Sequence, residues 1–168
     1  GLITVRANST RLPKKCLLNF GKFSVLGHVI ERLKIYGINP VVCTSTNIND
    51  NEIIETAKNH KCKYFRGSEI NKIKRWFDCA KFFNLDKFHT VDCDDPFFCG
   101  DEIKRSMNLL SEKNLDFVKP HNESSSGAAI LGYSIKTSSL SKLNFIEDDN
   151  LDTEMIDPFL LNIENCNF

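Results

Sequence analysis

The first residues of the chain that could do chemistry form a short basic, hydroxyl-rich segment, RANSTRLPKK at residues 6–15. Arg6 and Arg11 are planar forks of hydrogen-bond donors, and Lys15 is a compact positive charge. Ser9 adds a hydroxyl and a backbone N–H donor, both of which can face an anion. These residue types in one loop are suited to hold a chain of phosphates. The alternative is a solvated basic loop, which charge alone would favour.

Two residues shape the backbone of this loop. Asn8 tolerates the positive φ of a tight backbone curl. Pro13 stiffens the exit of the loop and removes one backbone donor. The residues at 2–5 are apolar and β-prone, which predicts a buried first strand. The basic segment is therefore expected directly after the carboxyl end of a strand.

A cluster of carboxylates follows another predicted strand, at residues 88–91. Asp92, Asp94 and Asp95 lie within four residues, where they repel each other unless a cation or water screens them. On an extended chain Asp92 and Asp94 point to the same side, and Mg²⁺ takes carboxylate, phosphate and water oxygens. Two interpretations stay open on these residues alone. They bind Mg²⁺, or Asp94 or Asp95 before Pro96 caps the following helix.

Polar residues also follow predicted strands at residues 41–43 and 63–65; they are Thr44, Ser45, Arg66, Gly67 and Ser68. Gly67 permits a close approach of a ligand to the backbone. Taken without the other clusters, Arg66 is better explained as half of a surface ion pair and Ser68 as a helix cap. Their position after strands makes nucleotide contact the competing interpretation.

Apolar residues at helical spacing alternate with these strands. Helices are expected at residues 25–33, 53–57, 73–83, 103–110, 138–143 and 155–163, and further strands at 117–118 and 128–135. Ser24 and Asp50 are expected to cap helices. The alternation predicts parallel β-α-β units in a three-layer α/β/α domain. Because ligands bind beyond the carboxyl ends of such strands, all four polar clusters are expected to meet in a single site.

Composition sets the limits of the interpretation. Lys+Arg and Asp+Glu number 22 each, and this zero net charge argues against a general nucleic-acid binder. The 168 residues suit a single domain, residues 1–168, and truncation at the C-terminus or membership of a longer chain stays open. The seven cysteines include no CxxC pair, so a zinc site has little support. The cysteines in apolar patterns are expected to be reduced core residues of a cytoplasmic protein; they are Cys16, Cys43, Cys62 and Cys79. No run is long enough to predict a membrane-spanning helix, and no membrane partner is expected.

The order R-x-x-S-x-R-L-P-x-K at residues 6–15 resembles the signature loop of the sugar cytidylyltransferases. The resemblance is closest to the 3-deoxy-manno-octulosonate and spore-coat-polysaccharide branches. F-R-G-S at residues 65–68 resembles a family segment, and V-D-C-D-D-P at residues 91–96 is similar to the family's V-Q-G-D-E-P. The likeness runs in order from Ile3 to about Phe98. It implies a GT-A-like nucleotidyltransferase fold with a mostly parallel sheet.

The resemblance also implies roles for the residues of all four clusters. The implied nucleotide-binding residues are Arg6, Asn8, Ser9, Arg11, Lys15, Thr44, Ser45, Arg66, Gly67 and Ser68. Arg11, Lys15 and Asp94 are implied to act in catalysis, and Mg²⁺ is implied to bind Asp94. Asp92 stands where the family has Gln, and it is a second candidate metal ligand because of its spacing from Asp94. Thr44 and Ser45 would meet the cytosine base. Family members carry a second, later metal ligand, for which Asp152 and Asp157 are the candidates near the end of this chain.

The function that the resemblance implies is CTP-dependent cytidylyl transfer. A hydroxyl of an acidic or surface-polysaccharide sugar attacks the α-phosphate of CTP, pyrophosphate leaves, and a CMP-sugar forms. Two alternatives stay open. One is a nucleotide-binding, catalytically incomplete domain of a larger polysaccharide-biosynthesis protein, and the other is a glycosyltransferase that uses a finished nucleotide-sugar. The sequence leaves open the identity of the sugar, and whether the domain forms a homodimer or belongs to a larger chain.

Overall fold

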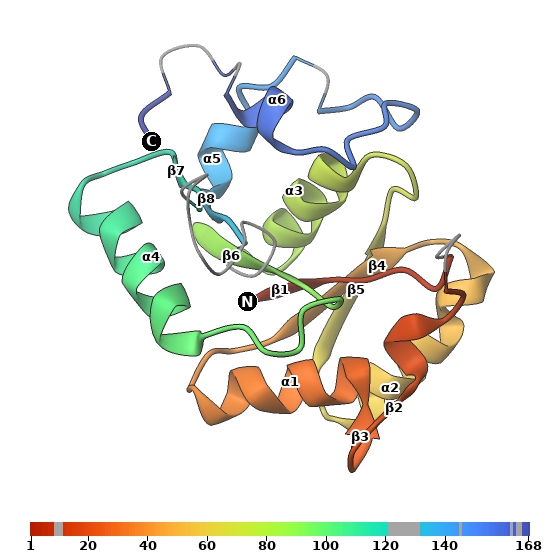
Figure 1. Ribbon diagram of the computed structural model, residues 1–168. Coiled ribbons are helices and arrows are strands. Elements are labelled where there is room, and N and C mark those ends of the chain that lie inside the picture. The colour runs from red at the N-terminus through yellow and green to blue at the C-terminus, as the bar shows by residue number, and fades with distance from the viewer. Residues whose placement is uncertain (9–11, 121–131, 145, 162, 164–165) are drawn as a thin grey trace.

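The fold is built on a six-stranded sheet with the strand order β5-β4-β1-β6-β8-β7 (Figure 1). The computed structural model describes residues 1–8, 12–120, 132–144, 146–161, 163 and 166–168. The strands are β1 (Leu2–Thr4), β4 (Val41–Ser45), β5 (Lys63–Gly67), β6 (Lys87–Asp92), β7 (Phe117–Val118) and β8 (Ser134–Lys136). β1 pairs in parallel with β4 and β6, and β4 with β5. The prediction of a mostly parallel sheet is confirmed.

Helices cover both faces of this sheet, as the alternating pattern predicts. They are α1 (Val25–Ile35), α2 (Asn51–Asn59), α3 (Lys72–Phe82), α4 (Gly100–Glu112), α5 (Thr137–Leu140) and α6 (Asp157–Leu160), with short 3-10 turns η1 (Lys15–Leu17) and η2 (Ile48–Asp50). A small hairpin, β2 (Asn19–Phe20) and β3 (Phe23–Ser24), precedes α1. Figure 1 shows α1 and α2 on one side of the sheet and α3 and α5 on the other. The three-layer α/β/α architecture is confirmed.

The two faces of the sheet have separate hydrophobic cores. Side chains alternate along each strand, so neighbouring residues enter different cores. Leu2 and Val41 pack in one core with Trp76 of α3, whereas Ile3 and Val42 pack in the other with α1 and α2. Near the carboxyl end of β1, the Trp76 ring N–H donates to the Thr4 hydroxyl at 2.7 Å. This bond fixes the start of α3 beside the end of the first strand.

Several predicted boundaries shift in the structure. Ser24 caps α1 as predicted, since its hydroxyl accepts the N–H of Gly27 at 3.1 Å. The last predicted strand, 128–135, is β8, which is shorter and antiparallel to β6, and residues 121–131 lie outside the described part of the chain. The final predicted helix, 155–163, is reduced to α6. Tertiary packing sets the direction of a strand in a sheet, and the sequence of a strand as short as β8 does not indicate that direction.

Asp50 does not cap α2, contrary to the prediction. Its carboxylate is buried, 1% exposed, and makes no capping bond. One oxygen accepts the backbone N–H of Ala7 at 2.7 Å. The other accepts the Thr44 hydroxyl at 2.8 Å and both the hydroxyl and the N–H of Ser45, at 2.5 and 3.1 Å. Asp50 therefore ties the loop after β1 to the end of β4.

Two further expectations can be compared with the structure. Cys16, Cys43, Cys62 and Cys79 are buried and unbridged, as predicted. Burial raises the pKa of the Cys16 and Cys62 thiols to about 11, which keeps them protonated. In the described part of the chain, no helix has the length and apolar character needed to cross a membrane.

Replacing Asp50 with Ala should destabilise the domain by about 2–4 kcal/mol, because several buried donors lose their acceptor together. Chemical unfolding in urea measures this change. Glu112→Ala is the control, since Glu112 is exposed at the end of α4 and its loss should alter stability by less than about 0.5 kcal/mol. Equal stability of the two variants would contradict the role assigned to Asp50.

Candidate functional site

A pocket of about 360 Å³ opens beyond the carboxyl ends of β1 and β6. Its charged lining residues come from four separate parts of the chain; they are Arg6, Lys15, Lys72, Arg75, Asp92, Asp94 and Glu154. Four of these are basic and three are acidic. A charged pocket at this edge of a parallel sheet is where ligands of such folds bind. It is therefore the candidate functional site.

The loop after β1 forms one wall of the pocket. The N–H of Lys14 donates to the carbonyl of Ala7 at 3.1 Å, and this closes the loop. Lys14, with φ 55°, takes the left-handed conformation that was expected of Asn8. Asn8 lines the pocket and accepts a bond from the Asn49 amide at 3.3 Å. Ser9 and Arg11 lie outside the described residues, so their predicted phosphate contacts stay predictions.

Lys15 and Asp94 meet across the pocket. Lys15 begins η1, which packs against α1 and α2, and Asp94 follows β6. Their ammonium and carboxylate groups form an ion pair, and the Asp94 side chain is 57% exposed. The structure therefore brings together two residues that the sequence assigned to one site. Both side chains are exposed enough to solvent that a ligand could replace the ion pair between them.

Asp92 lies deeper, on the α3 side of the sheet. Its Oδ1 is 3.7 Å from the ammonium of Lys72. Burial raises the pKa of Asp92, Lys72 opposes this rise, and the nearby carboxylates of Asp94 and Glu154 add to it. Asp92 and Asp94 both line the pocket, as their spacing predicts.

The helix-cap alternative for the acidic cluster is wrong. α4 begins at Gly100, its N-cap position is Cys99, and no side chain in the described part of the chain makes a capping bond there. Asp95 instead accepts the N–H of Phe97 at 3.4 Å. Asp94 has no part in the helix terminus, so its carboxylate remains available to the pocket.

The side chains of Thr44 and Ser45 do not reach this pocket. Both residues belong to β4, are at most 1% exposed, and bond to Asp50. Among the described residues Arg66 has no ion-pair partner; its guanidinium donates to the carbonyls of Ser45 and Asn47 at 3.0 and 2.6 Å. The structure uses these residues to hold the turn after β4. The base contact expected from the Thr44 and Ser45 hydroxyls is not available in this arrangement.

Gly67 and Ser68 also lie away from this pocket and border a separate shallow hollow. A Cβ atom on Gly67 would come within 2.8 Å of the Phe65 ring and 3.1 Å of the Arg75 side chain. The glycine is therefore needed for internal packing. The Ser68 hydroxyl accepts the N–H of Asn71 at 3.1 Å, just before α3. Ser68 therefore acts much as the helix-cap alternative expected, but it bonds to the N-cap residue Asn71 and not to α3 itself.

Three pocket residues were missed from the sequence. Lys72 and Arg75 stand three residues apart at the start of α3, where an aromatic stripe hides them. Glu154 reaches the pocket from the segment before α6. The predicted late candidates have other contacts: Asp152 accepts the N–H of Glu154 at 2.9 Å, and Asp157 accepts the Tyr133 hydroxyl at 2.5 Å. The only sequence signal for Glu154 is its closeness to Asp152.

The pocket fits a hard cation only if a bound ligand supplies further oxygen donors. Within the described ranges, no three His, Cys, Asp or Glu side chains gather closely enough to hold a metal. Asp92 and Asp94 offer carboxylate oxygens that are 45% and 57% exposed at the side chain. Mg²⁺ usually keeps several waters and binds one or two carboxylates with substrate phosphates. These two residues suit that pattern.

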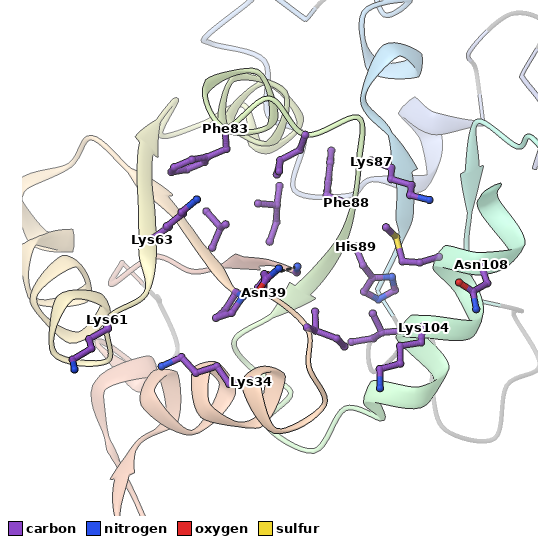
Figure 2. Close-up of a pocket in the computed structure, with 18 residues that line it drawn as sticks. Lys34, Asn39, Lys61, Lys63, Phe83, Lys87, Phe88, His89, Lys104 and Asn108 are labelled. Atoms are coloured by element: carbon purple, nitrogen blue, oxygen red, sulfur yellow. Dashed lines mark hydrogen bonds between the residues drawn. The ribbon is translucent and has the colours of Figure 1, made fainter.

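A larger cavity, of about 730 Å³, lies at the opposite edge of the sheet. Figure 2 shows its lysines arising from several elements around an apolar floor that includes Phe83 and Phe88; they are Lys34, Lys61, Lys63, Lys87 and Lys104. This cavity lies near the amino ends of β4 and β6, away from the loops that carry the predicted chemistry. Size alone would favour it, but the converging carboxylates and cations favour the smaller pocket.

The chain is similar to known proteins in sequence and in structure. The model of a family described as cytidylyltransferase matches residues 1–154. A solved cytidylyltransferase from Leptospira borgpetersenii has a TM-score of 0.86 and 28% identity, with 98% of this chain and 71% of that chain covered. A CMP:2-keto-3-deoxy-manno-octonic acid synthetase solved with CTP has a TM-score of 0.66 and 15% identity, with 84% and 75% covered, and shows the same fold.

A curated relative is an uncharacterised protein of Methanocaldococcus jannaschii. It is 31% identical over 124 residues, which make up 73% of this chain. The match covers 51% of that relative, so the chain spans about half the length of the curated protein it matches.

Proposed function

The chain belongs to the cytidylyltransferase family, and from this premise we propose that it binds CTP in the pocket beyond β1 and β6 and transfers the cytidylyl group to a sugar hydroxyl. The observation that carries the proposal is the meeting of Lys15 and Asp94, from loops 79 residues apart, at the carboxyl edge of a parallel sheet. A basic loop supplies charge for phosphates, and carboxylates beside it supply ligands for a cation.

The proposed reaction is a displacement at the α-phosphate of CTP. The acceptor oxygen forms a bond to the α-phosphorus, and the bond from that phosphorus to the bridging oxygen breaks. The electron pair leaves with pyrophosphate, and the hydroxyl proton passes to solvent. Arg11 and Lys15 neutralise the charge that grows on the leaving phosphates. Such transfer depends mainly on positioning and charge stabilisation.

Mg²⁺ is proposed as the cofactor, with Asp94 and Asp92 as its protein ligands. When bound, it would offset negative charge on the triphosphate. In the structure Lys15 holds Asp94 and Lys72 holds Asp92. A triphosphate that takes over the lysines would leave both carboxylates free to bind a cation. The pocket would thus exchange internal ion pairs for ion pairs with its ligand.

The acceptor is proposed to be an acidic or surface-polysaccharide sugar, and the setting is proposed to be the cytoplasm, where thiols stay reduced. A second candidate is a domain that binds CTP without turnover. The observation that favours it is that, among the described residues, no three His, Cys, Asp or Glu side chains gather closely enough to hold a metal. Precise alignment of the reacting oxygens matters, because a misplacement of about 1 Å can slow a reaction on the order of a hundredfold.

CTP with Mg²⁺ should raise the melting temperature more than ATP, GTP or UTP does. The expectation comes from the family, and thermal-shift titrations with the four nucleotides measure it. Equal shifts for purine and pyrimidine triphosphates would contradict the cytidine assignment while leaving a phosphate site. Release of pyrophosphate from CTP with a panel of sugars would then separate transfer from binding alone.

Lys15→Ala should weaken CTP binding by about 10- to 100-fold, since a charge-assisted contact contributes roughly 1.5–3 kcal/mol. Calorimetric titration measures the dissociation constant. Lys14→Ala is the matched control, because the adjacent Lys14 pairs with Glu52 and does not line the pocket. If the two variants bind CTP equally well, Lys15 is only a solvated loop residue.

Asp94→Asn should fold normally but lose the Mg²⁺-dependent tightening of CTP binding. Asn has nearly the shape of Asp and lacks the negative charge that a hard cation requires. The measurement is the ratio of CTP affinities with and without Mg²⁺. Asp101→Asn, at an exposed site on α4, should keep the parental ratio. An unchanged ratio in Asp94→Asn would remove Asp94 from the proposed metal site.

A further inference from the structure

Arg75 is a buried cation with unmet hydrogen-bonding capacity. It is 0% exposed and lines the pocket from α3. Its Nη1 donates to the carbonyl of Ser68 at 2.6 Å and to that of Glu69 at 3.4 Å. Its Nε and Nη2 have no hydrogen-bond partner among the residues that the structure describes. Because unpaired buried charges are costly, these two N–H groups indicate a missing anionic partner.

Two more cations stand beside Arg75. Arg6 donates from its Nη1 to the same Glu69 carbonyl, at 2.8 Å. Lys72 is one helical turn before Arg75, is 8% exposed, and lies with its ammonium 5.4 Å from the Trp76 ring centroid. Burial lowers the pKa of Arg75, and the nearby charge of Arg6 lowers it further. Three like charges so placed favour an anion between them.

Two carboxylates of the chain approach this group: Asp92, whose Oδ1 is 3.7 Å from the Lys72 ammonium, and Glu154. Glu154 is 2.9 Å from Arg6 through Oε2 and 3.9 Å from the Lys72 ammonium through Oε1. Its position is fixed by Thr153, whose buried hydroxyl accepts the N–H of Ile73 at 3.0 Å. Glu154 leaves Nε and Nη2 of Arg75 unbonded, so it neutralises the group only in part. Its side chain is 57% exposed, which leaves it room to move away.

We propose that Arg6, Lys72 and Arg75 form an oxyanion subsite on the α3 side of the pocket, which Glu154 covers until a substrate carboxylate or phosphate replaces it. The proposal deepens the proposed function and rests on it for the identity of the substrates. Lys15 reaches the pocket from η1, which packs with α1 and α2 on the opposite face of the sheet. A single ligand could therefore be held from both faces, with one anionic group at each.

Calorimetric titration of the full chain with inorganic pyrophosphate tests the subsite directly. Lys72→Met should lower the affinity about tenfold or more, since Met has a side chain of similar length to Lys but lacks the charge that contacts the anion. Glu154→Gln should raise the affinity, because a competing negative charge is removed. Lys74→Met is the matched control: Lys74 lies on the same helix but pairs with Asp78, outside this pocket, and should stay within about twofold of the parent.

Arg75→Gln should lower pyrophosphate affinity by at least as much as Lys72→Met. Because Arg75 is fully buried, its affinity is compared only if the circular dichroism and the cooperative unfolding of this variant match the parent. If they do not match, Lys72→Met and Glu154→Gln test the subsite. Unchanged affinity in Lys72→Met, or a loss in Glu154→Gln, would overturn the subsite.

The source of the anion is found by repeating the titrations with CTP and with glucuronate, a sugar carboxylate without phosphate. Weaker CTP binding in Lys72→Met assigns the subsite to a nucleotide phosphate. Unchanged CTP binding with weaker glucuronate binding assigns it to the acceptor. If the parent fails to bind CTP but its pyrophosphate affinity still depends on Lys72, the proposed function fails and the subsite stands.

Discussion

The site depends on one buried carboxylate. Asp50 accepts hydrogen bonds from the loop after β1 and from the last two residues of β4, so two neighbouring strand ends form one rigid unit. Arg66 supports the same turn through the carbonyls of Ser45 and Asn47. Buried polar groups need such partners, and here the partners also fix the geometry. The basic loop can therefore present its charges from a stable base.

The pocket itself is kept in order by ion pairs between distant segments. Lys15 pairs with Asp94, Lys72 approaches Asp92, and Arg6 pairs with Glu154. Partly exposed pairs of this kind add little to stability, so their main effect is to position the side chains. Removing both charges of a pair should then affect ligand binding more than folding. A site of this kind is preorganised for anions and remains easy to enter.

The order of strands and helices could be predicted because apolar periodicity reports burial directly, and Lys15 and Asp94 could be placed together because both follow strands of one parallel sheet. The environment of Thr44 and Ser45 could not be predicted, since the local sequence is the same whether these hydroxyls contact a ligand or Asp50. Arg75 was hidden for another reason: a basic residue in an amphipathic helix is normally solvated. The antiparallel direction of β8 depends on packing that a three-residue strand does not encode.

The contact between Arg6 and Glu154 joins positions 148 residues apart, and Thr153 reaches back to Asn71 across 82. A chain made from its amino terminus would therefore complete the sheet around β1, β4 and β5 long before the segment that closes the pocket is synthesised. Domains that depend on such distant contacts fold slowly, because loop closure must come first. During synthesis the cations of α3 would face water and cellular anions, so the nascent chain would meet oxyanions before it meets Glu154.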